Sequence, residues 1–290
     1  PQLLTTRNND GWSPLFYISA PLREAVRQAF ISRAERNLEL ILTRKLFSDV
    51  TLQCHVPETN SWVNLEAHKA ILWARCPFLH PFLSTDASTI DIPSTIQPED
   101  LKALLQYFYT DQLPKLDADI HRNLIETCKL MCPENTHLLS QANMRLGIAL
   151  TINAQSQYEK DINILYNNPL FSDVQLTIVD GNDTHLQTTL NAHKCVLCTS
   201  EYFETMFTSG LAETHTSEAA VRGNSHDAWV ETVKWLYLQP YKVKSVDLNL
   251  SILQVASLAL LPSLNFVAQV ATISKIAHNN IMKCIKSSIT

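Results

Sequence analysis

Two acid–histidine pairs are the first candidates for chemistry in this chain. Asp49 precedes His68 by 19 residues, and Asp173 precedes His193 by 20. Neither pair has a recurring Ser or Cys nucleophile with a base in reach. Buried aspartate and histidine side chains normally form hydrogen bonds to the backbone. We therefore interpret Asp49, His68, Asp173 and His193 as structural residues that stabilise the fold.

Cysteines and histidines offer two candidate metal sites. Cys195-x-x-Cys198 resembles half of a zinc site, but no second pair follows at a finger-like spacing. A second group combines two types of ligand: His121, Cys128, Cys132 and His137. Cys128 and Cys132 would share one helix face, where cysteine commonly acts as a small apolar residue. We expect no metal, no cofactor and no enzymatic activity, because no nucleophile or phosphate-binding pattern accompanies these residues.

The candidate residues belong to a unit that occurs twice. Residues 46–52 and 170–176 are identical at six of seven positions, 124 residues apart. Ala67-His68-Lys69 and Ala192-His193-Lys194 follow them, 125 residues apart. A period this long exceeds that of solenoid repeats and indicates a duplicated domain.

Composition narrows the class of protein. A chain of 290 residues suggests about two domains of roughly 150 residues. The net charge of −5, without a run of Lys or Arg, argues against nucleic-acid binding. The apolar stretch 248–261 is too short to span a membrane, and the N-terminus has no signal-peptide pattern. Seven cysteines spread singly favour reduced thiols and a cytoplasmic or nuclear location.

Two further features of the composition give expectations about the chain. It begins with Pro1 instead of Met, so we expect a piece of a longer or processed protein with domains upstream. Only five glycines occur, so we expect few residues with positive φ.

Periodicity predicts an α/β (α+β) arrangement of elements that repeats along the chain. Residues 1–20 indicate a linker. Apolar spacing and proline positions predict the elements of the first copy, which are a helix at 21–42, a hairpin at 50–56 and 63–65, two short helices split before Pro77, a strand at 89–92, and helices from Gln97, at 118–131 and at 135–149. The second copy repeats this order, with a helix at 154–165, a hairpin at 174–179 and 186–190, helices at 195–199 and 202–208, a polar stretch at 209–225, and helices around 229–236, 248–261 and 264–276.

These motifs together resemble the BTB/POZ domain. The first copy carries Phe47-Ser48-Asp49-Val50, Ala67-His68-Lys69, Arg75-Cys76-Pro77-Phe78 and Tyr107-Phe108-Tyr109-Thr110-Asp111. The second carries Phe171-Ser172-Asp173-Val174, Ala192-His193-Lys194, Glu201-Tyr202-Phe203, Met206-Phe207-Thr208-Ser209-Gly210 and Trp235-Leu236-Tyr237. The resemblance places the two domains at 21–150 and 151–280, with a tail at 281–290. The tandem is similar to ankyrin-BTB proteins and to Bruton-kinase-inhibitor-type double-BTB proteins, and no GTPase motif of the Rho-BTB type is present.

The resemblance implies a protein-interaction module. Many relatives are substrate adaptors of cullin-3-type RING ubiquitin ligases, and a hydrophobic-x-Glu segment after the second short helix meets the cullin. Leu211-Ala212-Glu213 has this pattern, whereas the first copy has Leu83-Ser84-Thr85-Asp86 there. The expected cullin-binding residues are therefore Met206, Phe207, Leu211 and Glu213, with an unknown protein substrate held elsewhere. The alternative is a non-ligase scaffold, transcriptional or signalling, whose domains only dimerise or dock partners.

The helices that precede each Phe-Ser-Asp-Val motif suggest how the domains associate. In dimerising BTB domains the equivalent helix packs across the two-fold interface. We expect the two domains to pair within one chain as a pseudo-dimer, in a protein that is a monomer or a homodimer. The residues expected at this interface are apolar: Val26, Phe30, Leu38, Ile41, Ile162 and Leu165.

Overall fold

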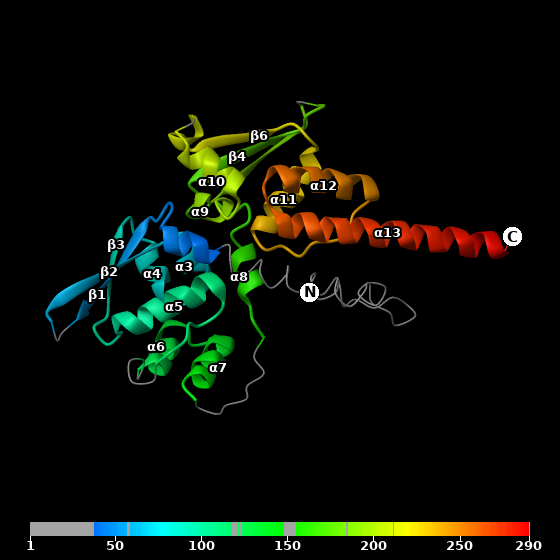
Figure 1. Ribbon diagram of the computed structural model, residues 1–290. Helices are drawn as coiled ribbons and strands as arrows, with labels where there is room; N and C mark the ends of the chain where they lie inside the picture. The colour runs from blue at the N-terminus through cyan, green and yellow to red at the C-terminus, as the bar shows by residue number, and fades with distance from the viewer. Residues whose placement is uncertain are drawn as a thin grey trace. The chain divides into compact units, whose positions relative to one another are not determined.

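The computed structural model describes most of the chain as two units. The described residues are 38–56, 59–117, 121, 123–147, 155–183, 185–210 and 212–289. The first unit contains the described residues up to Ser172 together with His193–Thr199, and the second contains Asp173–Ala192 and the described residues from Ser200 onward. Each unit has its own small sheet and helices (Figure 1).

The sheet of the first unit has three strands in the order β2-β1-β3. Strands β1 (Val50–Val56) and β2 (Ser61–Ala67) form an antiparallel hairpin in which Val50 lies opposite Ala67. Strand β3 (Thr89–Ile92) returns parallel to β1 and places Ile90 beside Leu52. The alternate residues of β1 are buried, as a half-buried strand requires.

The sheet of the second unit has the same topology, in the order β5-β4-β6. Strands β4 (Val174–Val179) and β5 (Gln187–Ala192) are antiparallel, and β6 (Glu218–Arg222) is parallel to β4. No strand was expected within the polar stretch 209–225, yet residues 218–222 form β6. Ala219 and Val221 of this strand are buried, although its ends are charged.

Helices follow each hairpin. The first unit contains helical residues 38–44, α3 (Lys69–Arg75), a 3₁₀ turn η2 (Pro77–Leu79), α4 (His80–Leu83), α5 (Pro98–Thr110), α6 (Leu124–Met131), α7 (Thr136–Arg145), α8 (Tyr158–Asn163) and α9 (Lys194–Leu197). The second contains α10 (Glu201–Thr208), a 3₁₀ turn η3 (Ala212–Thr214), α11 (His226–Leu236), α12 (Val246–Leu258) and α13 (Pro262–Ile289). The break before Pro77 is confirmed, and α13 continues through residues that were expected to form a tail.

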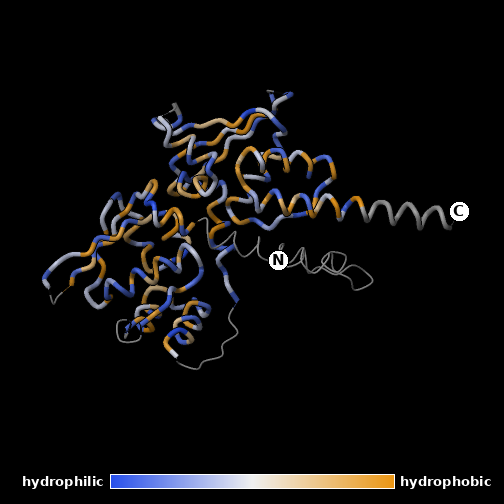
Figure 2. Tube along the Cα trace, viewed as in Figure 1, coloured by the Kyte–Doolittle hydropathy of each residue, from blue (hydrophilic) through white to orange (hydrophobic). Residues whose placement is uncertain are grey.

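Apolar residues build a core in each unit. Figure 2 shows polar and apolar residues alternating along the strands and helices. In the first unit, α5 buries Leu101, Leu104, Leu105 and Phe108, which are the residues expected from their helical spacing. In the second unit, α11 buries Trp229 and Val233. Within the described residues, no helix combines the length and the apolar character needed to cross a membrane.

The small number of glycines does not limit left-handed backbone, so that expectation was wrong. Nine non-glycine residues among those described have positive φ. Phe47 (φ 61°) and Phe171 (φ 59°) occupy the same place in the two copies of the motif. Such a conformation costs on the order of 1–3 kcal/mol in a non-glycine residue, so surrounding bonds must hold it.

Strand β6 provides a direct test of the second sheet. Val221→Ala removes two buried methyl groups and should lower the free energy of unfolding by about 2 kcal/mol. The matched control is Glu218→Ala at the exposed start of the strand, for which we expect a change below about 0.5 kcal/mol. Urea denaturation followed by circular dichroism measures both, and equal effects of the two substitutions would contradict a packed strand here.

Candidate interaction site

The repeated motifs of the first unit are tied to one another by His68. Its Nε2 lies 2.7 Å from the carbonyl oxygen of Leu46, the residue before Phe47. Its Nδ1 lies 2.6 Å from the hydroxyl of Tyr109, which also accepts a hydrogen bond from the His68 backbone N–H at 3.0 Å. A carbonyl can only accept, so Nε2 carries the proton and the Tyr109 hydroxyl donates to Nδ1. Both ring nitrogens are therefore occupied.

Asp49 lies close to this arrangement and fastens the start of α3. Its Oδ1 accepts a hydrogen bond from the backbone N–H of Lys69, the first residue of α3, at 2.7 Å. A carboxylate at a helix N-terminus satisfies a donor that the helix leaves unpaired and interacts favourably with the helix dipole. Asp49 is thus bonded to the backbone of α3.

The second copy repeats the bond from the histidine to the carbonyl and a backbone bond at the start of the first strand. His193 is buried, and its Nε2 lies 3.0 Å from the carbonyl of Leu170, the residue before Phe171. The backbone N–H of Asp173 donates to the carbonyl of Ala192 at 3.2 Å, as Asp49 N–H does to Ala67. In both copies the histidine therefore holds the carbonyl that precedes a left-handed phenylalanine.

Three members of the second candidate metal group have other partners. His121 Nδ1 lies 3.0 Å from Asp100 Oδ1, and His137 Nδ1 lies 3.1 Å from the Tyr107 hydroxyl. The Cys132 thiol donates to the carbonyl of Arg75 at 3.6 Å. Across the described residues, no three side chains of the ligand types gather as a metal site would require.

Helix α10 carries the candidate interaction site on an aromatic support. Phe203 stacks with Phe207, and both Tyr202 and Phe203 contact the ring of Trp229. Trp229 is itself fixed because its Nε1 donates to the carbonyl of Gly223 at 3.1 Å. Such aromatic contacts add to the area that the rings bury and hold α10 rigidly on the second unit.

Two of the expected cullin-binding residues lie beneath the surface of α10. Phe207 is 1% exposed and Met206 is 9% exposed. They therefore support the helix in this conformation. Leu211, the third expected residue, lies outside the described residues.

Glu213 lies in a short turn directly after α10. Gly210 has a φ of 78°, which favours glycine, and its N–H donates to the Thr214 hydroxyl at 3.1 Å. This bond closes the chain around η3, so Glu213 follows α10 closely and is half-buried. Burial and the nearby Glu213 carboxylate raise the pKa of Tyr202.

The matching segment of the first unit is built differently. Pro77 and Pro81 divide its second helical segment into η2 and the four-residue α4. Pro81 lies in the first turn of α4, where its missing N–H is tolerated, so it does not bend that helix. Leu83 is buried, and residues 84–88 lead to β3 without a helical turn. Only the second unit offers a helical turn with an acid at this place.

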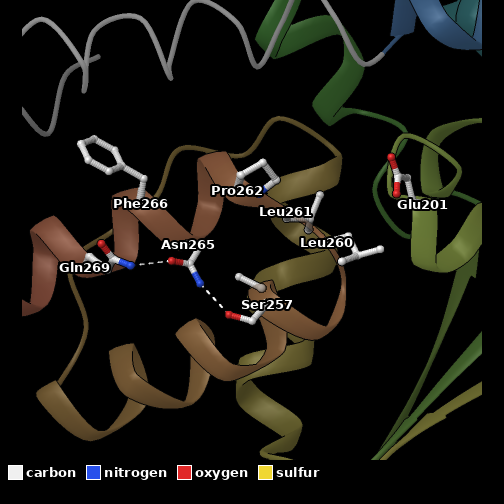
Figure 3. A pocket seen from close by; sticks show the side chains of 9 residues that line it. Glu201, Ser257, Leu260, Leu261, Pro262, Asn265, Phe266 and Gln269 are labelled. Atoms are coloured by element: carbon white, nitrogen blue, oxygen red, sulfur yellow. Dashed lines mark hydrogen bonds between the residues drawn. The ribbon is translucent and has the colours of Figure 1, made fainter.

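An open groove lies at the other end of α10. It has a volume of about 640 Å³ and extends from Glu201 to the turn between α12 and α13 (Figure 3). Asn265 is fixed in its wall, since its amide donates to the Ser257 hydroxyl and its Oδ1 accepts from Gln269, both at 2.7 Å. Leu260, which is 55% exposed, adds an apolar edge.

The described residues expected at a pairing interface are all buried. Leu38, Ile41, Ile162 and Leu165 have exposed fractions of 3% or less. Val26 and Phe30 lie outside the described residues. Helix α8, which contains Ile162, packs against α3 in the first unit. Pairing of the two domains along these helices stays a prediction.

Arg75 explains how α8 is fastened to the first unit. Its guanidinium is fully buried and lies 2.7 Å from both Asp111 and Asp161. It also lies over the rings of Tyr107 and Tyr158, at 5.0 and 4.9 Å from their centroids. Burial alone would lower the pKa of Arg75, but the neighbouring groups more than offset this, so its pKa is raised. We did not anticipate this cluster from the sequence.

The fold and these motifs define a tandem of BTB/POZ domains. The BTB/POZ family model matches residues 38–143 and 162–270, so the chain belongs to this family. The chain is similar to the "Putative BTB/POZ domain-containing protein R738" of Acanthamoeba polyphaga mimivirus, with 39% identity over 75 residues. The match covers 26% of this chain and 14% of the relative. BTB/POZ domains are protein–protein interaction domains, and the likeness to ankyrin-BTB proteins remains a sequence-based expectation.

The Tyr109 hydroxyl can be tested by a single substitution. Tyr109→Phe leaves the backbone N–H and Nδ1 of the buried His68 without their partner, so we expect a loss of about 1–3 kcal/mol in the free energy of unfolding. Tyr202→Phe, at a half-buried tyrosine, serves as the control with an expected loss below about 0.5 kcal/mol. Chemical denaturation is the measurement, and a neutral Tyr109→Phe would contradict the arrangement.

The two buried histidines predict a loss of stability in mild acid. Burial lowers the pKa of His68 and of His193, although the bonded carbonyls of Leu46 and Leu170 act in the opposite direction. Near pH 6.5 the unfolded chain takes up protons while these folded-state rings stay neutral. The contribution of these histidines to the free energy of unfolding is therefore fully present above about pH 6.5. It declines below this pH, by up to about 1.4 kcal/mol per pH unit for each histidine.

Urea denaturation between pH 7.5 and 5.5 measures this decline. His68→Gln removes one of the two titrating rings and should reduce the slope against pH, whatever its effect on stability at pH 7.5. An unchanged slope in His68→Gln would show that His68 does not titrate as we expect.

Proposed function

We propose that the chain is a substrate adaptor that recruits a cullin-3-type scaffold of a RING ubiquitin ligase through its second BTB/POZ domain. The observation that carries this proposal is the difference between the two copies after their second helical segment. The second copy has η3 with Glu213 directly after α10, and the first copy has neither a helical turn nor a glutamate there. The resemblance to cullin-binding relatives concerns this same segment.

The support for α10 suits a docking surface. Interfaces bind tightly when their central residues are already held in place, because less side-chain freedom is lost on binding. The contacts of Tyr202 and Phe203 with Trp229 hold α10 in this way. Phe207 and Met206 then act from below, since they are buried under the helix that η3 and Glu213 follow.

Leu211 and Glu213 have separate roles in this proposal. Leu211 would fill an apolar pocket of the scaffold, as buried anchors of protein interfaces do. Glu213 would accept hydrogen bonds from the scaffold or pair with one of its basic groups. Its carboxylate is close enough to Tyr202 to raise the pKa of that side chain.

The mechanism is proximity. One surface binds the scaffold and another part of the protein holds the substrate, so the ligase acts on a substrate at high effective concentration. This role needs no nucleophile, metal or cofactor in the chain itself.

A non-ligase scaffold is the second candidate. It is favoured by the first unit, where η2 and the four-residue α4 lead into residues 84–88 without the acidic turn. A protein of this kind would use both domains to dimerise or to dock transcriptional or signalling partners. Purification of stable complexes that contain partners but no cullin would favour it.

Binding to the purified N-terminal domain of a cullin-3-type scaffold tests the proposal. Leu211→Arg combined with Glu213→Arg removes the apolar anchor and reverses the acid, and we expect the affinity to fall by roughly 30-fold or more. Isothermal titration calorimetry with the full chain measures this change.

Asp86→Arg is the matched control for this measurement. It reverses an exposed acid at the corresponding place in the first unit, and it should leave the affinity unchanged. The assignment fails if the intact protein does not bind the scaffold domain. It also fails if the double variant binds as tightly as the original chain.

A further inference from the structure

Two buried cysteines meet where helices α3 and α6 end. Cys76 is the residue that caps the C-terminus of α3, and Cys132 caps the C-terminus of α6. Both side chains are buried, at 0% and 2% exposure, and both are free thiols. They are 56 residues apart in the sequence and lie in the first unit.

The two thiols form a reciprocal pair of hydrogen bonds. Cys76 Sγ lies 3.6 Å from the carbonyl oxygen of Met131, the residue before Cys132. Cys132 Sγ lies 3.6 Å from the carbonyl oxygen of Arg75, the residue before Cys76. A carbonyl oxygen is only about 3 Å from the next Cα, so each sulfur lies within about 6.5 Å of the other cysteine's Cα. Cys132 is also close enough to Cys76 to raise the pKa of the Cys76 thiol, in addition to burial.

We propose that Cys76 and Cys132 are an oxidisable dithiol that closes to a disulfide with hydrogen peroxide as the oxidant. One thiol first attacks peroxide, giving a sulfenic acid and one water. The second sulfur then displaces the hydroxyl group as a second water and forms the S–S bond. In sum, two S–H bonds and one O–O bond break, two electrons pass to peroxide, and one S–S bond and two molecules of water form.

Other cysteines are less suited to this reaction. Cys128 and Cys132 stand four residues apart on α6, where Cβ atoms are about 5–6 Å apart. A disulfide needs a Cβ separation of about 3.5–4.5 Å, so this pair would require the helix to unwind. Cys54 lies on β1, away from the ends of α3 and α6 at which Cys76 and Cys132 lie.

Burial makes the reaction slow and selective. It raises the pKa of Cys76 well above its usual range, so this thiol stays protonated in the closed structure. Cys132 is also buried, but it lies at the end of α6, and peroxide would reach it through local opening of that helix end. Cys76 then acts as the resolving thiol.

The disulfide would act on the part of the first unit that holds α8. Cys76 follows Arg75, whose carbonyl bonds Cys132 and whose guanidinium binds Asp161 of α8. Closing a long loop removes conformational freedom from the unfolded chain and raises stability. Oxidation therefore stabilises the unit to which α8 is fastened.

Peroxide treatment of the full chain carrying Cys284→Ser tests the proposal, because this background leaves only the six described cysteines. We expect the intact mass to fall by about 2 Da. Digestion without reductant should yield a peptide that links Cys76 to Cys132. The melting temperature should rise by several degrees and return to its starting value with dithiothreitol.

Single substitutions distinguish a disulfide between Cys76 and Cys132 from one that involves Cys128. Cys76→Ser and Cys132→Ser should each abolish the linked peptide, whereas Cys128→Ser should keep it. The linked peptide is also measured in the Cys284→Ser chain that keeps its other six cysteines. A single variant that fails to fold therefore does not decide the outcome. The proposal is overturned if the bond maps to another pair, if oxygen is added without loss of about 2 Da, or if both thiols remain open to alkylation after unfolding.

Discussion

The bond from a buried histidine to the carbonyl before a left-handed phenylalanine is the contact on which each copy depends. His68 makes it to Leu46, and His193 makes it to Leu170. The bond joins the turn before the first strand of each copy to the N-cap residue of the helix that follows the hairpin. In the first unit the Tyr109 hydroxyl completes the bonding of the ring, so the far end of α5 is connected to the same point. In each copy, the stretch around Phe-Ser-Asp-Val and the Ala-His-Lys motif are thus joined by this one hydrogen bond.

The fold was predictable from the sequence wherever the spacing of apolar residues matched the positions that are buried. Strand β4 occupies the residues expected from alternation, and α5 buries the expected apolar face. Strand β6 was missed because only two of its five residues are fully buried and its ends are charged. The first copy offered a usable signal, since Thr89–Ile92 was recognised as a strand at the same place in the duplicated order. Low glycine content misled us because hydrogen bonds, not residue type alone, hold residues such as Phe47 at positive φ.

The candidate site was less predictable, because it depends on how deeply its side chains are buried and on pairs of residues that are far apart in the sequence. Met206 and Phe207 belong to the expected motif, but only the packing around Trp229 reveals that they lie inside. Arg75 and Asp161 are 86 residues apart, and charged residues of this kind are usually at the surface. No periodic pattern marks such a pair, since it forms only when α8 reaches the end of α3.

The Arg75 cluster also determines where this chain can be divided. The family model for the second domain begins at residue 162, within α8, yet α8 belongs by its contacts to the first unit. A fragment that ends before Tyr158 would keep a buried guanidinium and lose one of its two carboxylates and one of its two aromatic rings. A buried cation deprived of a partner is strongly destabilising. An isolated first unit that includes α8 would keep both carboxylates and both aromatic rings around Arg75.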